Sequence, residues 1–479
     1  MEKGESNAGG GQRLPTVVIA APQGRSGKTT VSIGLCAALA RRGLKVQPFK
    51  KGPDYIDPSW LAAATGRSWR SLDTFLLPED TLLASYGRAC RDADFALVEG
   101  AMGLYDAPDE EGKGSTARLA RLLHAPVILV INTARMTRSV AAMVSGYRHF
   151  EPDTNVAGVI LNSVSGSRHE SKLRAAVERH CGIPVLGSIP RDESLGIPQR
   201  HLGIVPRGEV RESAAVIDQI SVRLEGRLDL DAILAVARQA TGPAAALADR
   251  PERAAPTVRI GVLSDRVFTF YYPENLEALA EAGAELVPVD SLLDQRLPDV
   301  DGLFIGGGFP ELFLEELEAN TGLRQDIARA IEEGLPVYAE CAGLMYLCSR
   351  IRWRSREHEM VGVIPGEVEI HERPQGHGYV AVDVVGDNPF FPRGQTLRGH
   401  EFHYSRLAPP KGLTYAYAVR RGRGMDGEVD GIVYKNTFAA YTHLHALGTP
   451  QWARAFVSVA ARERRRLPQL ADGKPKGGG

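Results

Sequence analysis

The sequence predicts an α/β protein built from two tandem, doubly wound domains. Three observations lead to this prediction. Short β-branched runs alternate with helical patterns from residue 16 to about residue 190, a second series of the same kind begins near residue 258, and an Ala- and Pro-rich stretch at 241–256 separates the two. Strands that read as uninterrupted apolar runs are typical of parallel sheets covered by helices on both faces.

The first half contains five apolar runs that we interpret as strands. They are TVVIA (16–20), FALVEG (95–100), PVILVIN (126–132), VAGVILN (156–162) and PVLGSIP (184–190). After the first run, residues 28–42 place Val31, Leu35 and Leu39 on one face of a helix, and Gly43 follows where glycine commonly ends helices. The first crossover of the sheet is therefore predicted with defined ends.

The second half repeats the alternation and sets the domain limits. Its strands are VRIGVLSD (258–265), ELVPVD (285–290), DGLFIGGG (301–308) and PVYAECAG (336–343), with one helix at 273–282 closed by Gly283 and another ending at Glu333. We predict domains at 15–240 and 257–465, a linker at 241–256, and disordered ends at 1–14 and 466–479.

Composition excludes several classes of partner. The 479 residues carry a formal net charge of −1, so there is no long-range field to attract nucleic acid or an anionic membrane surface. No run of about 18 apolar residues occurs, and the five cysteines are scattered and form no CxxC pair. We expect a cytoplasmic protein that binds small molecules.

A candidate phosphate site follows the first strand. TVVIAAPQGRSGKTT places a strand, a glycine-containing loop, a lysine and two threonines directly before a helix, where backbone N–H groups and the helix dipole bind polyphosphate. Pro22 occupies the position of the first glycine in the strict motif, so this is a variant P-loop. The alternative is a glycine-rich turn with an incidental lysine. The candidate ATP-binding residues are Gly24, Ser26, Gly27, Lys28, Thr29, Thr30 and, at a later strand end, Asn162.

Carboxylates stand near the predicted phosphate site. Glu99 ends the strand at 95–100, on the sheet edge where ligands of such folds bind, and is predicted to hold Mg²⁺ together with the Thr29 hydroxyl. KKGPDYIDP (50–58) adds Asp54, Tyr55 and Asp57, which suit metal binding or orientation of an attacking carboxylate. The alternatives are a solvated strand end and an ordinary surface turn.

A candidate nucleophile lies in the second half. LPVYAECAGLMYL places Cys341 on a tight strand-to-helix turn, where a thiol is exposed and activated. Gly307 and Gly308 follow another strand, and their N–H groups can stabilise an oxyanion. His443 is the preferred base for the thiol, with His445 as the other candidate. The alternative is that Cys341 is a small core residue, as the other cysteines are expected to be.

Together these segments resemble a known family. APQGRSGKTTVSIGL, PFKKGPDYIDPSWLAAATGR, LVEGAMGLYD, GSTARLARLLHAPVILV, FYYPENLEALAEAGAEL, GGGFPE, YAECAGLMYL, GHEFHYS and YTHLH resemble, in order, the cobyrinate a,c-diamide synthase family over about residues 15–450. The resemblance implies a P-loop NTPase-type domain similar to dethiobiotin synthetase, fused to a class I glutamine amidotransferase-type domain.

The resemblance also implies an activity. In that family ATP phosphorylates the a and c acetate carboxylates of a tetrapyrrole, and ammonia from glutamine displaces phosphate to leave amides. It implies Cys341 as the glutaminase nucleophile, His443 as its activator, and Lys28 with Thr29 as contacts to ATP and Mg²⁺. Asp54, Tyr55, Asp57 and Glu99 match motif positions associated with substrate carboxylates or ATP chemistry. The implied partners are glutamine, ATP and a tetrapyrrole polycarboxylate, without nucleic acid or membrane, and a homodimer is compatible with them.

Two departures from the family pattern keep alternatives open. Triad-type class I glutaminases carry Glu two residues after the histidine, where this chain has His445; the amidotransferases that act on corrinoids commonly lack that Glu, so this departure supports the subgroup. The segment HERPQGHGYV (371–380) also differs from many cobyrinate enzymes, so sirohydrochlorin or its nickel form is an alternative acceptor. A partitioning-type P-loop ATPase switch is the alternative of another class, but it leaves Cys341 and His443 unexplained.

Overall fold

The computed structural model describes residues 13–192, 197, 199–200, 203–207, 210, 212–242, 255–408 and 412–472. The chain forms two compact units, Met1–Arg250 and Pro251–Gly479, and the division falls within the predicted linker at 241–256. Of the ends predicted to be disordered, 1–14 and 466–479, residues 1–12 and 473–479 lie outside the described residues, as does most of the linker, whereas residues 466–472 are helical, contrary to the prediction.

Unit 1 is built on a seven-stranded sheet in the order β3-β2-β4-β1-β5-β6-β7, and every strand pair in it is parallel. β1, β4 and most of β5 are buried along their length, as the uninterrupted apolar runs predicted. The order reverses direction at β1, whose neighbours are β4 and β5, and in such sheets ligands bind beyond the carboxyl ends of the strands near the reversal. The strands are β1 Thr16–Ala20, β2 Val46–Lys51, β3 Arg70–Leu72, β4 Phe95–Glu99, β5 Val127–Asn132, β6 Val156–Val164 and β7 Val185–Pro190, beside a small pair, β8 Gln199–Arg200 and β9 Gly203–Ile204.

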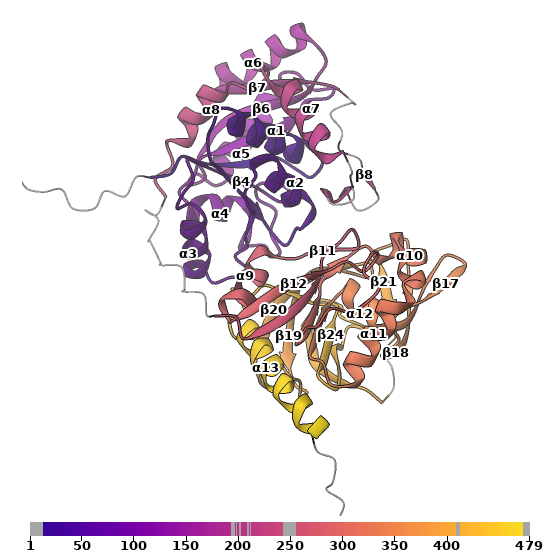
Figure 1. Ribbon diagram of the computed structural model, residues 1–479. Helices are drawn as coiled ribbons and strands as arrows, with labels where there is room; N and C mark the ends of the chain where they lie inside the picture. The colour runs from indigo at the N-terminus through magenta and orange to yellow at the C-terminus, as the bar shows by residue number, and fades with distance from the viewer. Residues whose placement is uncertain are drawn as a thin grey trace, which may run out of the picture. The chain divides into compact units, whose positions relative to one another are not determined.

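Helices surround this sheet (Figure 1). α1 packs against α2 and α7, and its apolar residues share one core with β1, β4 and β5. α1 ends at Arg41 and Gly43 follows with φ 86°, so the predicted glycine at the helix end is confirmed. The helices are α1 Lys28–Arg41, α2 Ile56–Thr65, α3 Glu79–Ala89, α4 Thr116–Leu122, α5 Ser139–Phe150, α6 Ser167–Cys181, α7 Ser213–Leu224 and α8 Leu230–Ala237.

Unit 2 is built on a ten-stranded mixed sheet in the order β12-β10-β13-β15-β24-β23-β22-β19-β20-β25. The strands from β12 to β24 pair in parallel, as predicted, and the pairs from β24 to β25 are antiparallel. The parallel strands are β10 Val258–Leu263, β12 Ala284–Val289, β13 Gly302–Ile305, β15 Val337–Glu340 and β24 Thr437–Ala440. The antiparallel strands are β19 Gly376–Val384, β20 Thr396–His403, β22 Thr414–Arg421, β23 Val429–Tyr434 and β25 His443–Leu444.

Smaller elements complete unit 2. β11 Phe268–Phe270 pairs with β14 Gly307–Gly308, and a four-stranded sheet contains β16 Cys348–Trp353, β17 Arg356–Glu359, β18 Ile364–Ile370 and β21 Ser405–Leu407. The helices are α9 Pro273–Glu281, the 3-10 turn η3 Pro310–Leu312, α10 Leu314–Ala319, α11 Thr321–Glu332, α12 Ala342–Leu347 and α13 Gln451–Asp472.

α13 extends past residue 465, where the sequence predicted the second domain to end. Residues 460–467 are all Ala, Arg, Glu or Leu, which have good helix propensity. None of the helices in the described part of the chain is long and apolar enough to cross a bilayer.

Candidate functional site

The phosphate loop joins β1 to α1 and is fixed by close packing. Gly27 precedes α1 with φ 92°, a conformation that residues with a side chain rarely adopt. A Cβ at Gly27 would also lie 2.3 Å from Nδ2 of Asn162. Ser26 Oγ donates to the Gln23 carbonyl at 2.9 Å. The loop therefore requires glycine at residue 27 for both conformation and space.

Asn162, near the end of β6, contacts this loop directly. Its Nδ2 donates to the Ser26 carbonyl at 3.0 Å, and its Oδ1 accepts from the Ser163 N–H at 2.9 Å. The side chain thus braces the loop from a neighbouring part of the sheet. Its predicted contact with adenine stays a prediction.

Lys28 is the buried cation of the loop. Its Nζ donates to the Met102 carbonyl at 2.7 Å, and its side chain is largely buried. Burial lowers the pKa of Lys28, and the nearby charge of Lys50 lowers it further. Thr30 lies in the first turn of α1, and a Cβ at Gly24 would meet no atom within 4 Å. For these two residues, binding to ATP stays a prediction.

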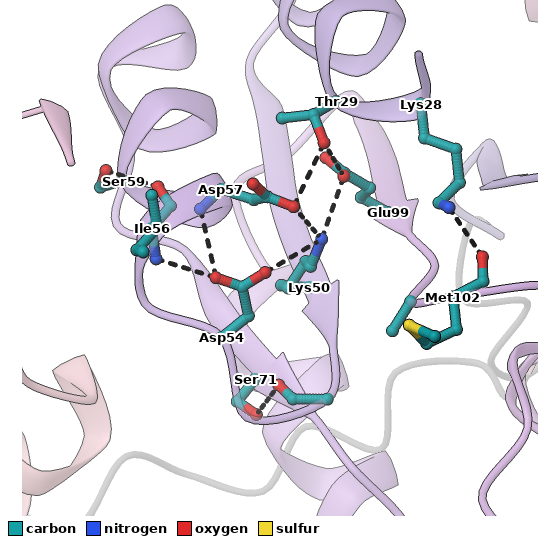
Figure 2. Close-up of polar contacts among 12 residues, drawn as sticks. Lys28, Thr29, Lys50, Asp54, Ile56, Asp57, Ser59, Ser71, Glu99 and Met102 are labelled. Carbon is teal, nitrogen blue, oxygen red and sulfur yellow. Dashed lines mark hydrogen bonds and ion pairs between the residues drawn. The ribbon is translucent and has the colours of Figure 1, made fainter. Parts of the chain in front are cut away.

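The predicted carboxylates converge on Lys50, at the end of β2 (Figure 2). Lys50 Nζ lies 2.6 Å from Asp57 Oδ2, 3.0 Å from Glu99 Oε1 and 3.3 Å from Asp54 Oδ2. Lys50 and Glu99 are fully buried, whereas Asp54 and Asp57 are partly exposed. The sheet therefore assembles three carboxylates from two segments around one ammonium group.

Thr29 links this cluster to the phosphate loop. Its Oγ1 donates to Glu99 Oε1 at 2.7 Å and lies 3.2 Å from Asp57 Oδ2. The second oxygen of Glu99, Oε2, is buried and makes no hydrogen bond to any described residue. A buried carboxylate oxygen beside a hydroxyl matches the oxygen ligands that Mg²⁺ prefers, so these residues fit the predicted ion.

Among the described residues, no group of three or more His, Cys, Asp and Glu side chains is arranged to hold a metal ion by itself. Proteins usually bind Mg²⁺ with one or two carboxylates and the substrate phosphates as ligands. Thr29 and Glu99 as its protein ligands stay a prediction.

The charges of the cluster are strongly coupled. Burial alone would lower the pKa of Lys50, but Asp57, Glu99 and Asp54 outweigh it and raise that pKa well above its usual value. Burial, followed by the charge of Asp57, raises the pKa of Asp54 to about 7. Burial opposes ionisation of Asp57, but the contact with Lys50 prevails and lowers the pKa of Asp57. The Lys50 ammonium group thus stays charged, and it lies beside the Asp54 carboxyl group, whose pKa is raised to about 7.

Asp54 and Tyr55 also shape the loop before α2. Asp54 Oδ1 accepts from the N–H groups of Ile56 and Asp57 at 2.8 and 3.2 Å, so it caps the segment that carries Asp57. The Tyr55 ring is buried and meets Trp69 edge to face, with centroids 6.4 Å apart. A contact of Tyr55 with substrate stays a prediction.

In unit 2, Cys341 stands on a strained turn between β15 and α12. Its φ of 50° and ψ of −99° lie outside the favoured regions for a residue with a side chain, at a cost of about 1–3 kcal/mol. The turn is held by the Cys341 N–H, which donates to the Ala440 carbonyl at 2.7 Å. Strain of this kind is typical of a nucleophile elbow. The strand-to-helix turn predicted from the sequence is therefore present, but the prediction of an exposed thiol is wrong, because Cys341 is buried with 3% of its surface exposed.

His443 lies against Cys341, as the sequence hypothesis requires. Burial alone would lower the pKa of His443, but a side-chain hydrogen bond with Cys341 and contact with Glu340 raise it to about 10. His443 Nδ1 lies 3.2 Å from Glu340 Oε2. The ring nitrogen left for Cys341 is therefore Nε2, and the three side chains form a Cys–His–Glu arrangement.

Of the two predicted oxyanion glycines, Gly307 borders the same ring and Gly308 lies against Val267. A Cβ at Gly307 would lie 2.5 Å from His443 Cε1, and one at Gly308 would lie 1.8 Å from the Val267 carbonyl oxygen. Both positions therefore exclude a larger residue. That their N–H groups bind an oxyanion stays a prediction.

Two further histidines lie near His443 with different contacts. The His400 ring stacks on His443 with centroids 4.8 Å apart, and its Nδ1 lies 3.3 Å from the Tyr272 hydroxyl. His445 packs on the Tyr272 ring at 4.5 Å, and its Nε2 lies 3.8 Å from Glu274 Oε2. His445 therefore faces a different carboxylate from the one that contacts His443.

Sequence reasoning missed three residues of these sites, namely Lys50, Glu340 and His400. Lys50 lies in the polar segment KKGPDYIDP, and the residues before it, LKVQPF, mix polar and apolar side chains, so no local pattern indicates a buried cation. Glu340 directly precedes Cys341, whereas the triad pattern places its carboxylate two residues after the histidine. His400 had no local signal, because the pairing of β20 with β25 brings it to His443.

Comparison with known proteins assigns a family model to each unit. The model of the CobQ/CobB/MinD/ParA nucleotide binding domain matches residues 17–204, and that of the CobB/CobQ-like glutamine amidotransferase domain matches residues 259–451. A cobyrinate a,c-diamide synthase of Magnetococcus marinus is 45% identical over 94% of this chain and 98% of the relative. Synthases of the same name from Archaeoglobus fulgidus and Methanothermobacter thermautotrophicus are each 44% identical, over 94% and 93% of this chain and 98% and 99% of the relatives.

Unit 1 therefore carries the nucleotide-binding domain and unit 2 the glutamine amidotransferase domain. Identity above 40% extends over nearly the whole length of these relatives. The chain belongs to the cobyrinate a,c-diamide synthase family, and it is a carbon–nitrogen ligase that takes its amide nitrogen from glutamine.

Proposed function

We propose that this enzyme converts the a and c acetate side chains of cobyrinate to amides, with ATP as the activating nucleotide. The observation that carries the proposal is that one chain holds both a phosphate loop beside clustered carboxylates and a Cys341–His443 pair. The names of the most similar relatives supply the acceptor.

The first half of the reaction is assigned to unit 1. A substrate carboxylate oxygen attacks the γ-phosphorus of ATP, ADP leaves, and an acyl phosphate forms. Ammonia then attacks the acyl carbon and loses a proton. Phosphate leaves together with the oxygen that joined it to that carbon, which yields the amide. Lys28 and the N–H groups of the phosphate loop bind the β- and γ-phosphates, and Lys50 offsets the negative charge where acceptor and phosphate meet.

Thr29 and Glu99 would hold Mg²⁺ at this site. When bound, the ion neutralises charge on the triphosphate. Asp57 and Asp54 keep Lys50 in place from the open side of the cluster.

The second half is assigned to unit 2. The thiol proton of Cys341 passes to His443, and the sulfur attacks the side-chain amide carbon of glutamine. Ammonia leaves with a proton from the imidazolium, and water then hydrolyses the thioester to glutamate and regenerates the thiol. The raised pKa of His443 supports a proton held on the ring next to the sulfur.

A panel of acceptors tests the proposed substrate. Purified enzyme is given ATP, Mg²⁺, glutamine and either cobyrinate, hydrogenobyrinate, sirohydrochlorin or nickel sirohydrochlorin, and mass spectrometry counts the amides formed. We expect two amides on cobyrinate and the highest kcat/KM for it. A clear preference for a sirohydrochlorin would reject cobyrinate as the acceptor while leaving the ligase chemistry intact.

A further inference from the structure

We propose that Glu340 is the positioning carboxylate of the glutaminase centre and orients His443 toward Cys341. This assignment rests on the proposed roles of Cys341 and His443. It places the third member of the catalytic arrangement directly before the nucleophile in sequence, rather than two residues after the histidine.

The first argument is the contact with the ring. Glu340 Oε2 lies 3.2 Å from His443 Nδ1, and both side chains are only 2% exposed. A carboxylate that accepts from Nδ1–H fixes the tautomer that leaves Nε2 available, and it stabilises the imidazolium once Nε2 takes a proton.

The second argument is that Glu340 is itself held in place. Its other oxygen, Oε1, accepts from the Leu444 N–H at 3.0 Å and from the Tyr338 hydroxyl at 3.0 Å. Leu444 adjoins His443 in β25, so one carboxylate fixes both the ring and the backbone that carries it. A side chain with both oxygens engaged has little freedom to rotate, as positioning requires.

Groups from β14, β15 and β20 surround the His443 ring beside this carboxylate. Cys341 and Glu340 face the ring from β15 and the turn after it, His400 stacks on it from β20, and Gly307 borders it from β14. Burial, followed by the charges of His443 and His445, lowers the pKa of His400 well below its usual value, so His400 stays neutral. Among these groups Glu340 is the one carboxylate.

Glu274 is the rival carboxylate, and its geometry is less favourable. Its Oε2 lies 3.8 Å from His445 Nε2, which exceeds hydrogen-bond distance, whereas Glu340 Oε2 lies 3.2 Å from His443 Nδ1. His445 Nδ1 accepts from the Leu447 N–H at 3.2 Å.

Glu340→Gln in the full-length chain tests the proposal. Glutamine at residue 340 keeps the size of the side chain but presents an NH₂ or an uncharged oxygen to Nδ1. We expect kcat/KM for glutamine to fall by about 10²-fold to 10⁴-fold, mostly in kcat, because the ring loses its tautomer and its counter-charge. Amidation supported by ammonium salts should stay within about threefold of the parent, since unit 1 is unchanged. The basic limb of the pH profile should also move to lower pH, because the charge that favours the imidazolium is removed.

Glu401→Gln is the matched control. Glu401 is equally buried, but it accepts hydrogen bonds from the backbone N–H groups of Arg423 and Gly424 and lies beside His403. We expect it to leave the pH profile and kcat for glutamine unchanged. Glu274→Gln tests the rival carboxylate in the same assay.

Three outcomes overturn the proposal. The first is a Glu340→Gln enzyme whose glutaminase activity stays within threefold of the parent. The second is a loss of glutaminase activity in the Glu274→Gln enzyme alone. The third is an equal loss of glutaminase activity in the Glu340→Gln and Glu401→Gln enzymes, with ammonium-dependent amidation lost as well. If Glu340→Gln does not fold, ¹⁵N NMR of the parent decides, because an unprotonated Nδ1 in His443 is incompatible with the proposal. A Cys341→Ser enzyme that still hydrolyses glutamine would reject the proposed function itself, whatever the result at residue 340.

Discussion

Lys28 donates to a backbone carbonyl, that of Met102, and a bound triphosphate would offer its Nζ a charged acceptor instead. Lys28→Ala removes that charge, and we expect amidation to fall by at least about 10²-fold with either glutamine or ammonium as the nitrogen donor. The measurement is product formation by mass spectrometry with each donor. Lys45→Ala is the control, because Lys45 is exposed at the start of β2. Near-normal activity of the Lys28 variant would contradict the interpretation of the loop.

The lack of a side chain at Gly307 leaves room for the His443 ring. Alanine at residue 307 would put a Cβ 2.5 Å from His443 Cε1 and 3.2 Å from the Phe270 ring, so the histidine must move. Displacement by about 1 Å can cost about 10²-fold in rate, and we expect a loss of that order in glutaminase kcat with ammonium-dependent amidation unchanged. Gly146→Ala is the control, since a Cβ there meets nothing within 4 Å. Unchanged glutaminase kcat would show that His443 is not held by this contact.

At the scale of elements, the segment from the end of β2 to the first turn of α2 is proposed to position the acceptor carboxylates. Asp57 Oδ2 is shared by Lys50 and Thr29, so this segment connects the buried ammonium group to the phosphate loop. Asp57→Asn weakens both contacts, and we expect slower turnover without loss of the folded state. Because two acetates must be presented in turn, the two amidations should slow unequally and monoamide should accumulate.

Time-resolved mass spectrometry of monoamide and diamide checks this prediction. Asp92→Asn, an exposed substitution before β4, is the control. If Asp57 serves only the metal, both steps slow together and excess Mg²⁺ partly restores them. An unchanged monoamide fraction would therefore remove the segment from acceptor positioning.

The elements also show where local sequence patterns suffice. The strand from Thr16 to Ala20 and the helix from Lys28 were predicted to within a residue, because an apolar run, a glycine loop and a helical period are local features. β2 was not predicted. Its six residues, VQPFKK, are all buried, but they include Lys50 and Lys51 and so do not form an apolar run. The antiparallel strands of unit 2 were also missed, because half-exposed strands such as β19 have mixed burial and a weak signal.

At the scale of the whole molecule, the two units divide the work. Cys341→Ala removes only the sulfur, and we expect glutamine-dependent amidation to disappear while ammonium salts still support it. The two nitrogen donors are compared in one assay of the same preparation. Loss of both activities in a folded variant would contradict the separation of glutaminase and ligase between the units.

The sequence by itself determined the family, the two α/β domains, the phosphate loop and the cysteine turn. Each of these depends on neighbouring residues, such as the glycine and lysine before α1 or the strand, cysteine and helix around Cys341. Which side chains meet across the sheets was decided only by the tertiary structure. Glu340 and His443 are 103 residues apart and meet at the ends of β15 and β25, and Lys50 meets Glu99 because β2 pairs with β4. Strand order is set by the packing of whole layers, so no local pattern could have selected Glu340 over Glu274 or placed three carboxylates around one lysine.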